Sequence, residues 1–187
     1  MRYPASETAK KHDRILNVAA KLFRERGFDG AGVAEIMKLA GLTHGAFYVH
    51  FDSKQALAAE ALARAFAQSD SHIYSMTTNK ADPKQAFLES YLSARHRDHS
   101  GAGCAIAAVG AEVARDPILR APFTEQVKRM IARMAERFRW QRKKPARQNA
   151  IHLLSTAVGA LILARAIDDP ELSDEILAST RDSLGSL

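Results

Sequence analysis

Three Asp-Pro pairs, Asp82-Pro83, Asp116-Pro117 and Asp169-Pro170, divide the later part of this sequence into helical segments. In each pair the carboxylate can cap a helix N-terminus, and the proline suits the first helical position because that position needs no backbone N–H. The sequence contains no run of alternating β-branched and polar residues, and no hairpin pattern built around an Asn-Gly or Asp-Gly pair. We therefore expect an all-α fold.

Apolar residues spaced at the helical period predict about nine helices. Gly27 and Gly41 are expected to end the first two, Thr43 to cap the third, and Asp52 or Ser53 to cap the fourth. The expected ranges are about 15–27, 33–40, 43–51, 53–76, 83–95, 104–114, 117–142, 151–167 and 170–184. The fifth range is expected to be one continuous helix, and the sequence Lys143-Lys144-Pro145 is expected to end the seventh.

The length and cysteine content bound the class of protein. A chain of 187 residues can bury one substantial core, or a small module joined to a larger one. Cys104 is the only cysteine, and the N-terminal sequence MRYPASETAKKHDR lacks the apolar core of a signal peptide. The most apolar stretch, 151–167, contains polar residues and is shorter than the ~20 residues of a membrane helix. We expect a cytoplasmic protein with a buried helix there and no membrane partner.

Residues 31–51 have the pattern of a helix-turn-helix, whose second helix enters the major groove of DNA and must be apolar on its inner side. Leu42, Phe47 and Phe51 can form that inner side. The side chains left for the DNA are Thr43, His44, Gly45, Tyr48, Val49 and His50. The pattern predicts double-stranded DNA as a partner.

These side chains suit different parts of the DNA. Gly45 permits close approach to the groove floor, His44 can hydrogen-bond a base edge or a phosphate, and Val49 can touch a thymine methyl. The side chains suited to phosphates are Tyr48, His50 and Lys54. Lys54 also begins the fourth helix, whose N-terminal dipole attracts a phosphate.

The segment VAEIMKLAGLTHGAFYVHFDSKQAL resembles the signature of the TetR family. In that signature a short helix, an Ala-Gly turn, a glycine-containing recognition helix with Phe-Tyr, then His-Phe and Ser-Lys follow in order. The resemblance covers about Ala9 to Leu62, because ILNVAAKLFRERGFDG is similar to the family's first helix, and beyond it only helix number and lengths are similar. Family members usually have Ser or Thr at the start of the second helix, whereas this chain has Ala31 and Gly32, which removes one expected phosphate contact.

The resemblance implies a transcriptional regulator, usually a repressor, with a helix-turn-helix domain (1–53) and a larger helical domain (54–187) for ligand binding and dimerisation. It implies a homodimer on a palindromic operator, released when a small-molecule effector bound among helices four to eight pivots helix four. It implies no catalysis, cofactor or metal. The positions at which family members meet DNA are occupied by His44, Gly45, Tyr48, Val49, His50 and Lys54.

The resemblance also places the dimer interface on the last two helices. The residues expected there are Leu154, Val158, Gly159, Leu161, Ile162 and Ile176. Ser155 and Gly159 are four residues apart and would let a second helix approach closely. The alternative is that this apolar stripe belongs to an internal core.

Candidates for the effector pocket mix aromatic, polarizable and small polar groups. They are Phe66, Phe87, Tyr91, Cys104, Phe123, Met130 and Met134. Ordinary core packing explains the same residues. Cys104, expected in the first turn of the helix at 104–114, has two interpretations: a reactive thiol that senses oxidants or electrophiles, favoured by the helix dipole, or a buried small hydrophobe.

Two other classes of protein compete with a DNA-binding regulator: an enzyme, and a helical interaction protein without DNA affinity. No phosphate loop, dinucleotide fingerprint or nucleophile elbow occurs in the sequence. His96 and His99 lack the further ligands of a complete metal site, so we expect them at the surface. The basic run 128–147 alternates with apolar residues, which indicates a solvated helix face, with an acidic partner as the alternative. No operator role is expected for Arg142, Lys143, Lys144 and Arg147.

Overall fold

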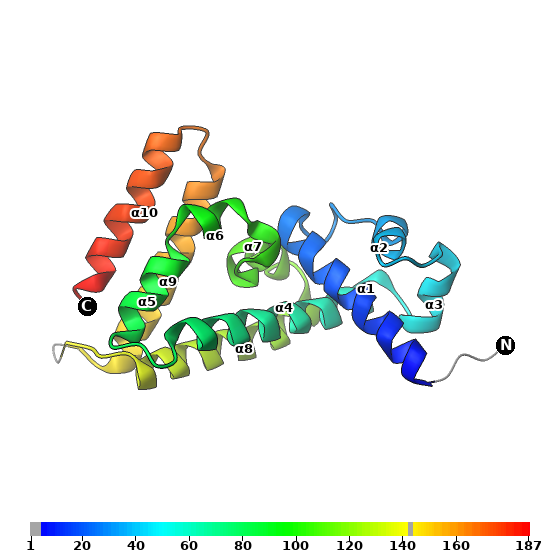
Figure 1. Cartoon of the computed structure of the whole chain (residues 1–187), viewed down its shortest axis with the longest axis horizontal. Helices are drawn as coiled ribbons and strands as arrows, with labels where there is room; N and C mark the ends of the chain where they lie inside the picture. The colour runs from blue at the N-terminus through cyan, green and yellow to red at the C-terminus, as the bar shows by residue number, and fades with distance from the viewer. Residues whose placement is uncertain (1–4, 142–143) are drawn as a thin grey trace.

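The computed structural model describes residues 5–141 and 144–187, and these residues form ten α-helices, two short 3₁₀ helices and no strand (Figure 1). The expectation of an all-α fold is confirmed. The helices are α1 (Ala5–Arg26), α2 (Val33–Leu39), η1 (His44–Ala46), α3 (Phe47–His50), α4 (Lys54–Thr77), α5 (Pro83–Tyr91), α6 (Ala94–Asp98), η2 (Ser100–Ala102), α7 (Ala105–Val113), α8 (Pro117–Arg137), α9 (Ala146–Ala166) and α10 (Pro170–Gly185).

The helix starts predicted at Ser53 and at the three Asp-Pro pairs are confirmed, and at each of them a side chain caps the backbone. The carboxylates of Asp82, Asp116 and Asp169 each accept a hydrogen bond from a backbone N–H in the first turn of α5, α8 and α10. Ser53 does the same for α4, where its Oγ accepts from the Ala56 N–H at 3.0 Å. Thr43 lies at the N-cap position of η1, but its side chain makes no capping bond.

Four predicted boundaries are wrong. Helix α1 begins at Ala5 rather than near residue 15, and α9 begins at Ala146 rather than near residue 151. The helix expected over 83–95 is two helices, because Ser93 ends its first part and caps α6 by accepting a hydrogen bond from the His96 N–H at 3.2 Å. Helix α8 ends at Arg137, before the sequence Lys143-Lys144-Pro145, and Pro145 instead precedes α9. Arg142 and Lys143 lie outside the described residues.

Buried apolar side chains form two clusters. The first joins α1–α3 to the N-terminal half of α4, to α7 and to the start of α8. The second joins α5, the C-terminal half of α8, α9 and α10. Residues Leu57 to Phe66 of α4 therefore pack with the N-terminal helices, although the expected domain boundary lies just before them. A movement of α4 would act directly on the packing of the N-terminal helices.

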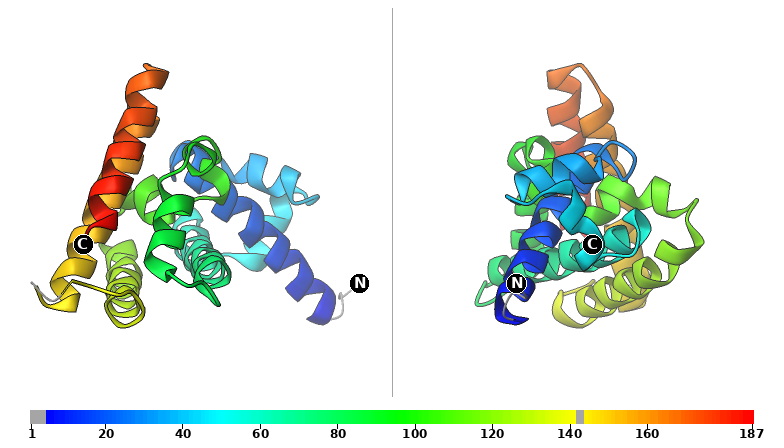
Figure 2. Two further views of the ribbon diagram at one scale, coloured as in Figure 1. Left: turned by 60° about the vertical axis from the view of Figure 1, so that its left-hand side comes forward. Right: turned by 90° about the vertical axis from the view of Figure 1, so that its right-hand side faces the viewer.

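The molecule is elongated, with α1–α3 at one end and the α9–α10 pair at the other (Figures 1 and 2). Helices α4 and α8 run between the two ends, and α7 lies against α1 in the middle. Among the described residues, α9 is the one helix long and apolar enough to cross a membrane. Its buried side packs against α7, α8 and α10, as expected for a core helix.

Candidate functional site

The segment η1–α3, which we name the recognition segment (His44–His50), follows a tight turn at Gly41. Gly41 has φ +72°, a left-handed conformation that glycine adopts without strain. Phe47 and Phe51 are 2% and 3% exposed and stack on each other, so they anchor the segment in the first core. Tyr48 and Val49 are 69% and 73% exposed and point away from it. The segment is thus apolar on its inner side and open on the outer side.

The remaining residues predicted for DNA contact lie around this outer side. Thr43, His44 and Gly45 are exposed, and His50 and Lys54 are half-buried. A Cβ atom added at Gly45 would meet no other atom within 4 Å, so the backbone there faces open space. Backbone free of neighbouring atoms is what close approach to a groove floor requires. The structure brings these residues together on one surface.

The start of α1 lies beside the recognition segment, a neighbour that the helix-turn-helix pattern alone does not reveal. The rings of His12 and His50 are 5.9 Å apart, and His12 also stacks on Phe51. Burial, followed by the nearby His12 and Lys11, lowers the pKa of His50. His50 therefore carries its proton less readily than an ordinary histidine.

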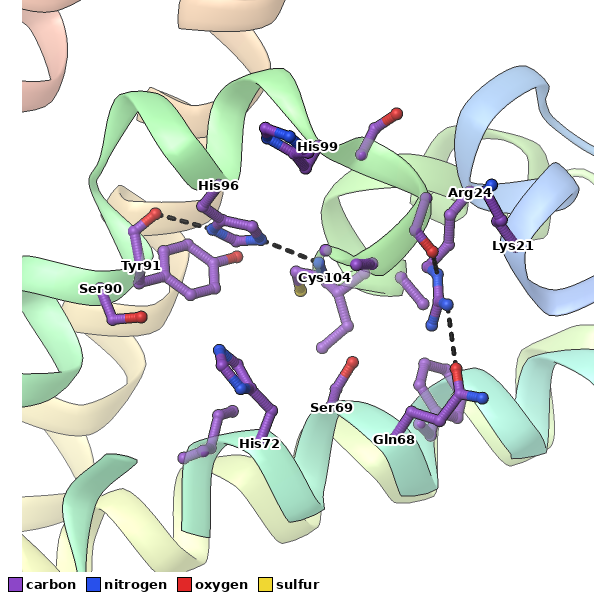
Figure 3. Close-up of a pocket in the computed structure, with 18 of the residues that line it drawn as sticks. Lys21, Arg24, Gln68, Ser69, His72, Ser90, Tyr91, His96, His99 and Cys104 are labelled. Carbon is purple, nitrogen blue, oxygen red and sulfur yellow. Dashed lines mark hydrogen bonds between the residues drawn. The ribbon is translucent and has the colours of Figure 1, made fainter. Parts of the chain in front are cut away.

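A cavity of about 800 Å³ lies between α1, α4, α5–α7 and α8, next to the first core (Figure 3). Four of the seven residues predicted for the pocket line it: Phe66, Tyr91, Cys104 and Met130. The other three, Phe87, Phe123 and Met134, do not. Phe87 is fully buried and stacks on Tyr91, and Phe123 packs edge-on against Phe66, so both lie behind the lining.

Sequence reasoning missed the polar part of the lining. Arg24, Gln68, Ser69, His72 and His96 all face the cavity (Figure 3). One signal was available for Arg24, which follows the buried Leu16 and Ala20 at intervals of four residues and therefore shares their helix face. The other four needed the tertiary structure.

His96 is not a surface residue, and the expectation that it would be is wrong. Its Nδ1 lies 2.7 Å from the Tyr91 carbonyl and its Nε2 lies 2.9 Å from the Cys104 N–H. A carbonyl only accepts and an N–H only donates, so the proton is on Nδ1 and the ring is neutral. Burial lowers the pKa of His96 from 6.5 to about 4, in agreement with this tautomer. The ring joins α6 to the start of α7.

Cys104 occupies the N-cap of α7 rather than its first turn, is 7% exposed and lines the cavity. His99 is exposed, as expected. Within residues 5–141 and 144–187, no group of three or more His, Cys, Asp or Glu side chains could hold a metal ion.

The last two helices present a second surface. Leu154 and Leu161, two of the residues predicted for a dimer interface, are 4% and 0% exposed and belong to the protomer core. Val158, Gly159 and Ile176 are half-buried, and Ile162 is exposed. The large apolar side chains exposed on α9 and α10 are Ile151, Ile162, Leu163 and Leu172. Helix α9 is therefore apolar on two sides, one turned inward and one outward.

The C-terminal part of α8, which carries the first part of the basic run, lies at the end of the molecule far from the recognition segment (Figure 1). Its described Lys and Arg side chains are exposed. Arg133 pairs with Asp70 at 2.9 Å and Lys128 with Glu125 at 2.8 Å. These contacts agree with a solvated helix face.

Two hydrogen bonds connect the end of the molecule that carries the recognition segment to the elements around the cavity. Glu112 of α7 accepts a hydrogen bond from the Phe28 N–H at 2.7 Å, just after Gly27 closes α1 in a left-handed conformation. Arg24 of α1 donates to the Gly101 carbonyl at 2.8 Å. Both η2 and α7 line or flank the cavity, so a change there reaches α1 directly.

Comparison with known proteins places residues 15–61 in a family described as bacterial regulatory proteins, tetR family. The transcriptional repressor DhaR of Mycobacterium sp. is 27% identical over 66% of this chain and 59% of its own length. The repressor KstR2 of Rhodococcus jostii is 42% identical over 32% of this chain and 30% of its own length. The chain therefore spans less than two thirds of these curated relatives.

Solved structures match over the whole fold. The reduced form of E. coli NemR has a TM-score of 0.78 at 22% identity, over 95% of this chain and 96% of that one. A TetR-family transcriptional regulator from Cytophaga hutchinsonii has a TM-score of 0.80 at 18% identity, over 100% of this chain and 98% of that one. The matched family consists of regulatory proteins, in agreement with the expectation that the chain is not an enzyme. The helix-turn-helix geometry, the family match over 15–61 and the similarity of the complete fold lead to one conclusion: residues 15–61 belong to the tetR family of bacterial regulatory proteins, and the chain as a whole has the fold of TetR-family regulators.

Proposed function

We propose that the protein is a cytoplasmic transcriptional repressor whose homodimer binds a palindromic operator and leaves it when a small molecule enters the cavity. The recognition segment carries this proposal. Exposed Tyr48 and Val49, above buried Phe47 and Phe51, provide the short protruding helix that major-groove reading requires. His44 and Gly45 would face base edges, and Thr43, Tyr48, His50 and Lys54 would face phosphates.

Dimerisation through the outer faces of α9 and α10 would set the spacing of two recognition segments. Ile151, Ile162, Leu163 and Leu172 offer apolar surface of the kind that a subunit interface buries. The added Cβ at Gly159 meets nothing within 4 Å, so a partner helix could approach the backbone there. Two half-sites one helical turn apart, ~34 Å, would match a two-fold dimer.

Release would follow from the position of the cavity. Its walls include α1 and α4, which also build the core behind the recognition segment. A ligand that prefers one arrangement of these helices would shift the population toward dimers whose recognition segments no longer fit successive grooves. Modification of Cys104 would act at the same place, since the thiol lines the same cavity. One structural relative was solved in a form described as reduced, which gives this second trigger some support.

Selection from random-sequence duplex DNA tests the proposal without knowledge of the operator. We expect the protein to enrich an inverted repeat, because a two-fold dimer reads two equal half-sites. Tyr48→Phe should enrich the same repeat less efficiently, since it removes a phosphate contact and leaves base contacts in place. A pool that stays random after repeated rounds with folded protein would refute the proposal and favour a helical interaction protein.

A further inference from the structure

Arg24 is a buried cation with an unused hydrogen-bond donor. It is 7% exposed, its Nε donates to the Gly101 carbonyl at 2.8 Å, and its Nη2 donates to Gln68 Oε1 at 2.9 Å. Its Nη1 has no partner among the described residues, although the side chain lines the cavity (Figure 3). Both of its partners are neutral. The guanidinium charge therefore has no counter-ion in direct contact.

The other charges around the cavity offset one another. The charged side chains in its lining besides Arg24 are Lys21, Glu25, Arg95 and Asp98. All four are exposed, and Glu25 lies 3.9 Å from Lys21 Nζ. Glu25 acts on Arg24 at a distance but pairs with Lys21, and Asp98 pairs with Arg97, so the buried Arg24 has no counter-ion in direct contact. Burial lowers the pKa of Arg24 below its ordinary value, which reflects the cost of desolvating this charge.

The rest of the lining combines an apolar wall with two more poorly satisfied polar atoms. The apolar wall consists of Phe66, Ile73, Met76, Ile106 and Met130. The Oγ of Ser69 is buried without a hydrogen-bond partner in the described structure, and the hydroxyl of Tyr91, a residue 4% exposed, interacts only with the weakly hydrogen-bonding thiol of Cys104. Buried polar groups in proteins are normally satisfied, so Arg24 Nη1, Ser69 Oγ and this poorly satisfied hydroxyl around one cavity indicate a polar ligand.

We propose that the cavity binds an organic acid, a monocarboxylate with an apolar body and a hydroxyl or carbonyl group away from the acid. The carboxylate pairs with Arg24, the apolar body lies along Phe66 and Met130, and the second polar group meets the Tyr91 hydroxyl. A carboxylate fits better than a phosphate, because one unbalanced charge and one free guanidinium nitrogen match a single negative charge. This assignment rests on the proposed role of the cavity as the effector site and narrows its ligand to a chemical class.

The position of Arg24 gives the acid a direct path to the recognition end. Arg24 belongs to α1, and its present partners lie on η2 and α4. A carboxylate that draws the guanidinium toward the cavity competes with the Gly101 carbonyl and Gln68, and so changes how α1 packs against both elements.

Calorimetric titration of the full chain with acids and their amides tests the assignment without any DNA. The probes are benzoate, 4-hydroxybenzoate, 4-hydroxycinnamate and 2-naphthoate, each paired with its neutral amide. We expect at least one acid to bind at least tenfold more tightly than its amide. Arg24→Met should abolish this preference while leaving the affinity for the amide within about threefold.

Gln68→Glu is the matched variant that keeps the shape of the cavity. It places a carboxylate at the atom that already accepts from Arg24 Nη2, so the protein supplies its own counter-ion. We expect at least a tenfold loss of affinity for the acid, even if Arg24→Met does not fold. Absence of binding by every acid, equal binding of acids and amides, or an undiminished preference in Gln68→Glu would overturn the assignment. Amides that bind and release DNA would overturn it while leaving the proposed function intact.

Discussion

A poorly satisfied polar atom in the cavity lining lowers the free energy of unfolding of the protein without a ligand. The Tyr91 hydroxyl is buried with only the thiol of Cys104 beside it, and burial, followed by this thiol, raises the pKa of the phenol well above its ordinary value of 10.0. The ring itself packs on Phe87 and His96, and these contacts do not need the hydroxyl. The hydroxyl does not increase the stability of the fold, so its presence at this position points to a role in binding.

Tyr91→Phe should therefore leave the free energy of unfolding unchanged or raise it by up to about 1 kcal/mol, since a buried hydroxyl whose only neighbouring partner is a weakly bonding thiol opposes folding. Urea unfolding followed by circular dichroism measures the difference. Tyr74→Phe, which changes an exposed tyrosine, serves as the control. A loss of more than about 1 kcal/mol in Tyr91→Phe would mean that the hydroxyl has a stronger partner in the free protein.

The next prediction about a single residue concerns the reactivity of the Cys104 thiol. Its thiol is 7% exposed, and a reagent can reach it through the cavity that it lines. We expect a small quinone or maleimide to modify Cys104 and to lower DNA affinity, because the adduct fills space between α4 and α7. Mass spectrometry and DNA binding of the same samples measure both steps, with Cys104→Ser as the control. An unmodified thiol, or an adduct without effect on binding, would leave Cys104 as a packing residue.

Among the elements, α6 shows why the sequence predicted some boundaries and not others. Asp-Pro pairs mark helix starts because the cap is local, and all three were correct. The interruption at Ser93 depends on His96 turning inward to Tyr91 and Cys104, and on Arg165 of α9 donating to the His96 carbonyl at 2.8 Å. A contact between residues far apart in the sequence, such as that between His96 and Arg165, produces no periodic pattern in a short stretch of sequence.

The neutral ring of His96 makes the stability of this region depend on pH. The pKa is 6.5 in the unfolded chain and about 4 in the folded one, so the unfolded state binds the proton first. Stability should fall as the pH drops from about 6.5 to about 4, by at most about 3 kcal/mol, and stay unaffected by this group above pH 6.5.

Unfolding of His96→Gln and of the exposed control His99→Gln measures this effect. His99→Gln should follow the pH dependence of the wild type. His96→Gln should be less stable at pH 7 but should lose less stability between pH 6.5 and 4. Parallel curves for wild type and His96→Gln would show that the ring does not titrate as its contacts imply.

Helix α9 supports a prediction about assembly. Gly159→Arg and Ile162→Glu should yield folded monomers, because both positions lie on the outward side and the space above Gly159 is open. Leu161→Glu should instead unfold the protomer, since it buries an unpaired charge at a position with 0% exposure. Light scattering and circular dichroism separate the two outcomes. Dimers of unchanged stability in both outward variants would move the interface to another surface.

At the scale of the whole molecule, the sequence predicted the fold and the recognition segment better than it predicted the cavity. Phe47 and Phe51 are four residues apart, at the start and just after the end of one short helix, and the residues between them are exposed or half-buried, so their burial follows from local periodicity. The cavity is assembled from α1, α4, α5–α7 and α8, and its polar lining occupies positions that composition cannot distinguish from ordinary surface. Ser69 and His72 can be identified as lining residues only from the structure, in which α4 passes along the cavity.

The same arrangement explains how one molecule could both read DNA and respond to a ligand. Helix α4 packs with the N-terminal helices over its first half and lines the cavity further along. Arg24 connects α1 to Gly101 of η2, and Glu112 connects α7 to Phe28, which lies just after α1. The two proposed functions therefore share elements, and a separate hinge is unnecessary.

Fluorescence anisotropy with the selected duplex and a scrambled one, across a range of salt concentrations, tests the central claim of sequence-specific DNA binding most directly. The wild type should prefer the selected duplex by at least about 10³-fold. Tyr48→Phe and Lys54→Ala should weaken binding to both duplexes, and Lys54→Ala should also reduce the salt dependence, because phosphate contacts carry no sequence information. His44→Ala should lose about 1–3 kcal/mol of discrimination at particular base pairs. Equal affinity of the folded wild type for both duplexes, unchanged in all three variants, would contradict the account.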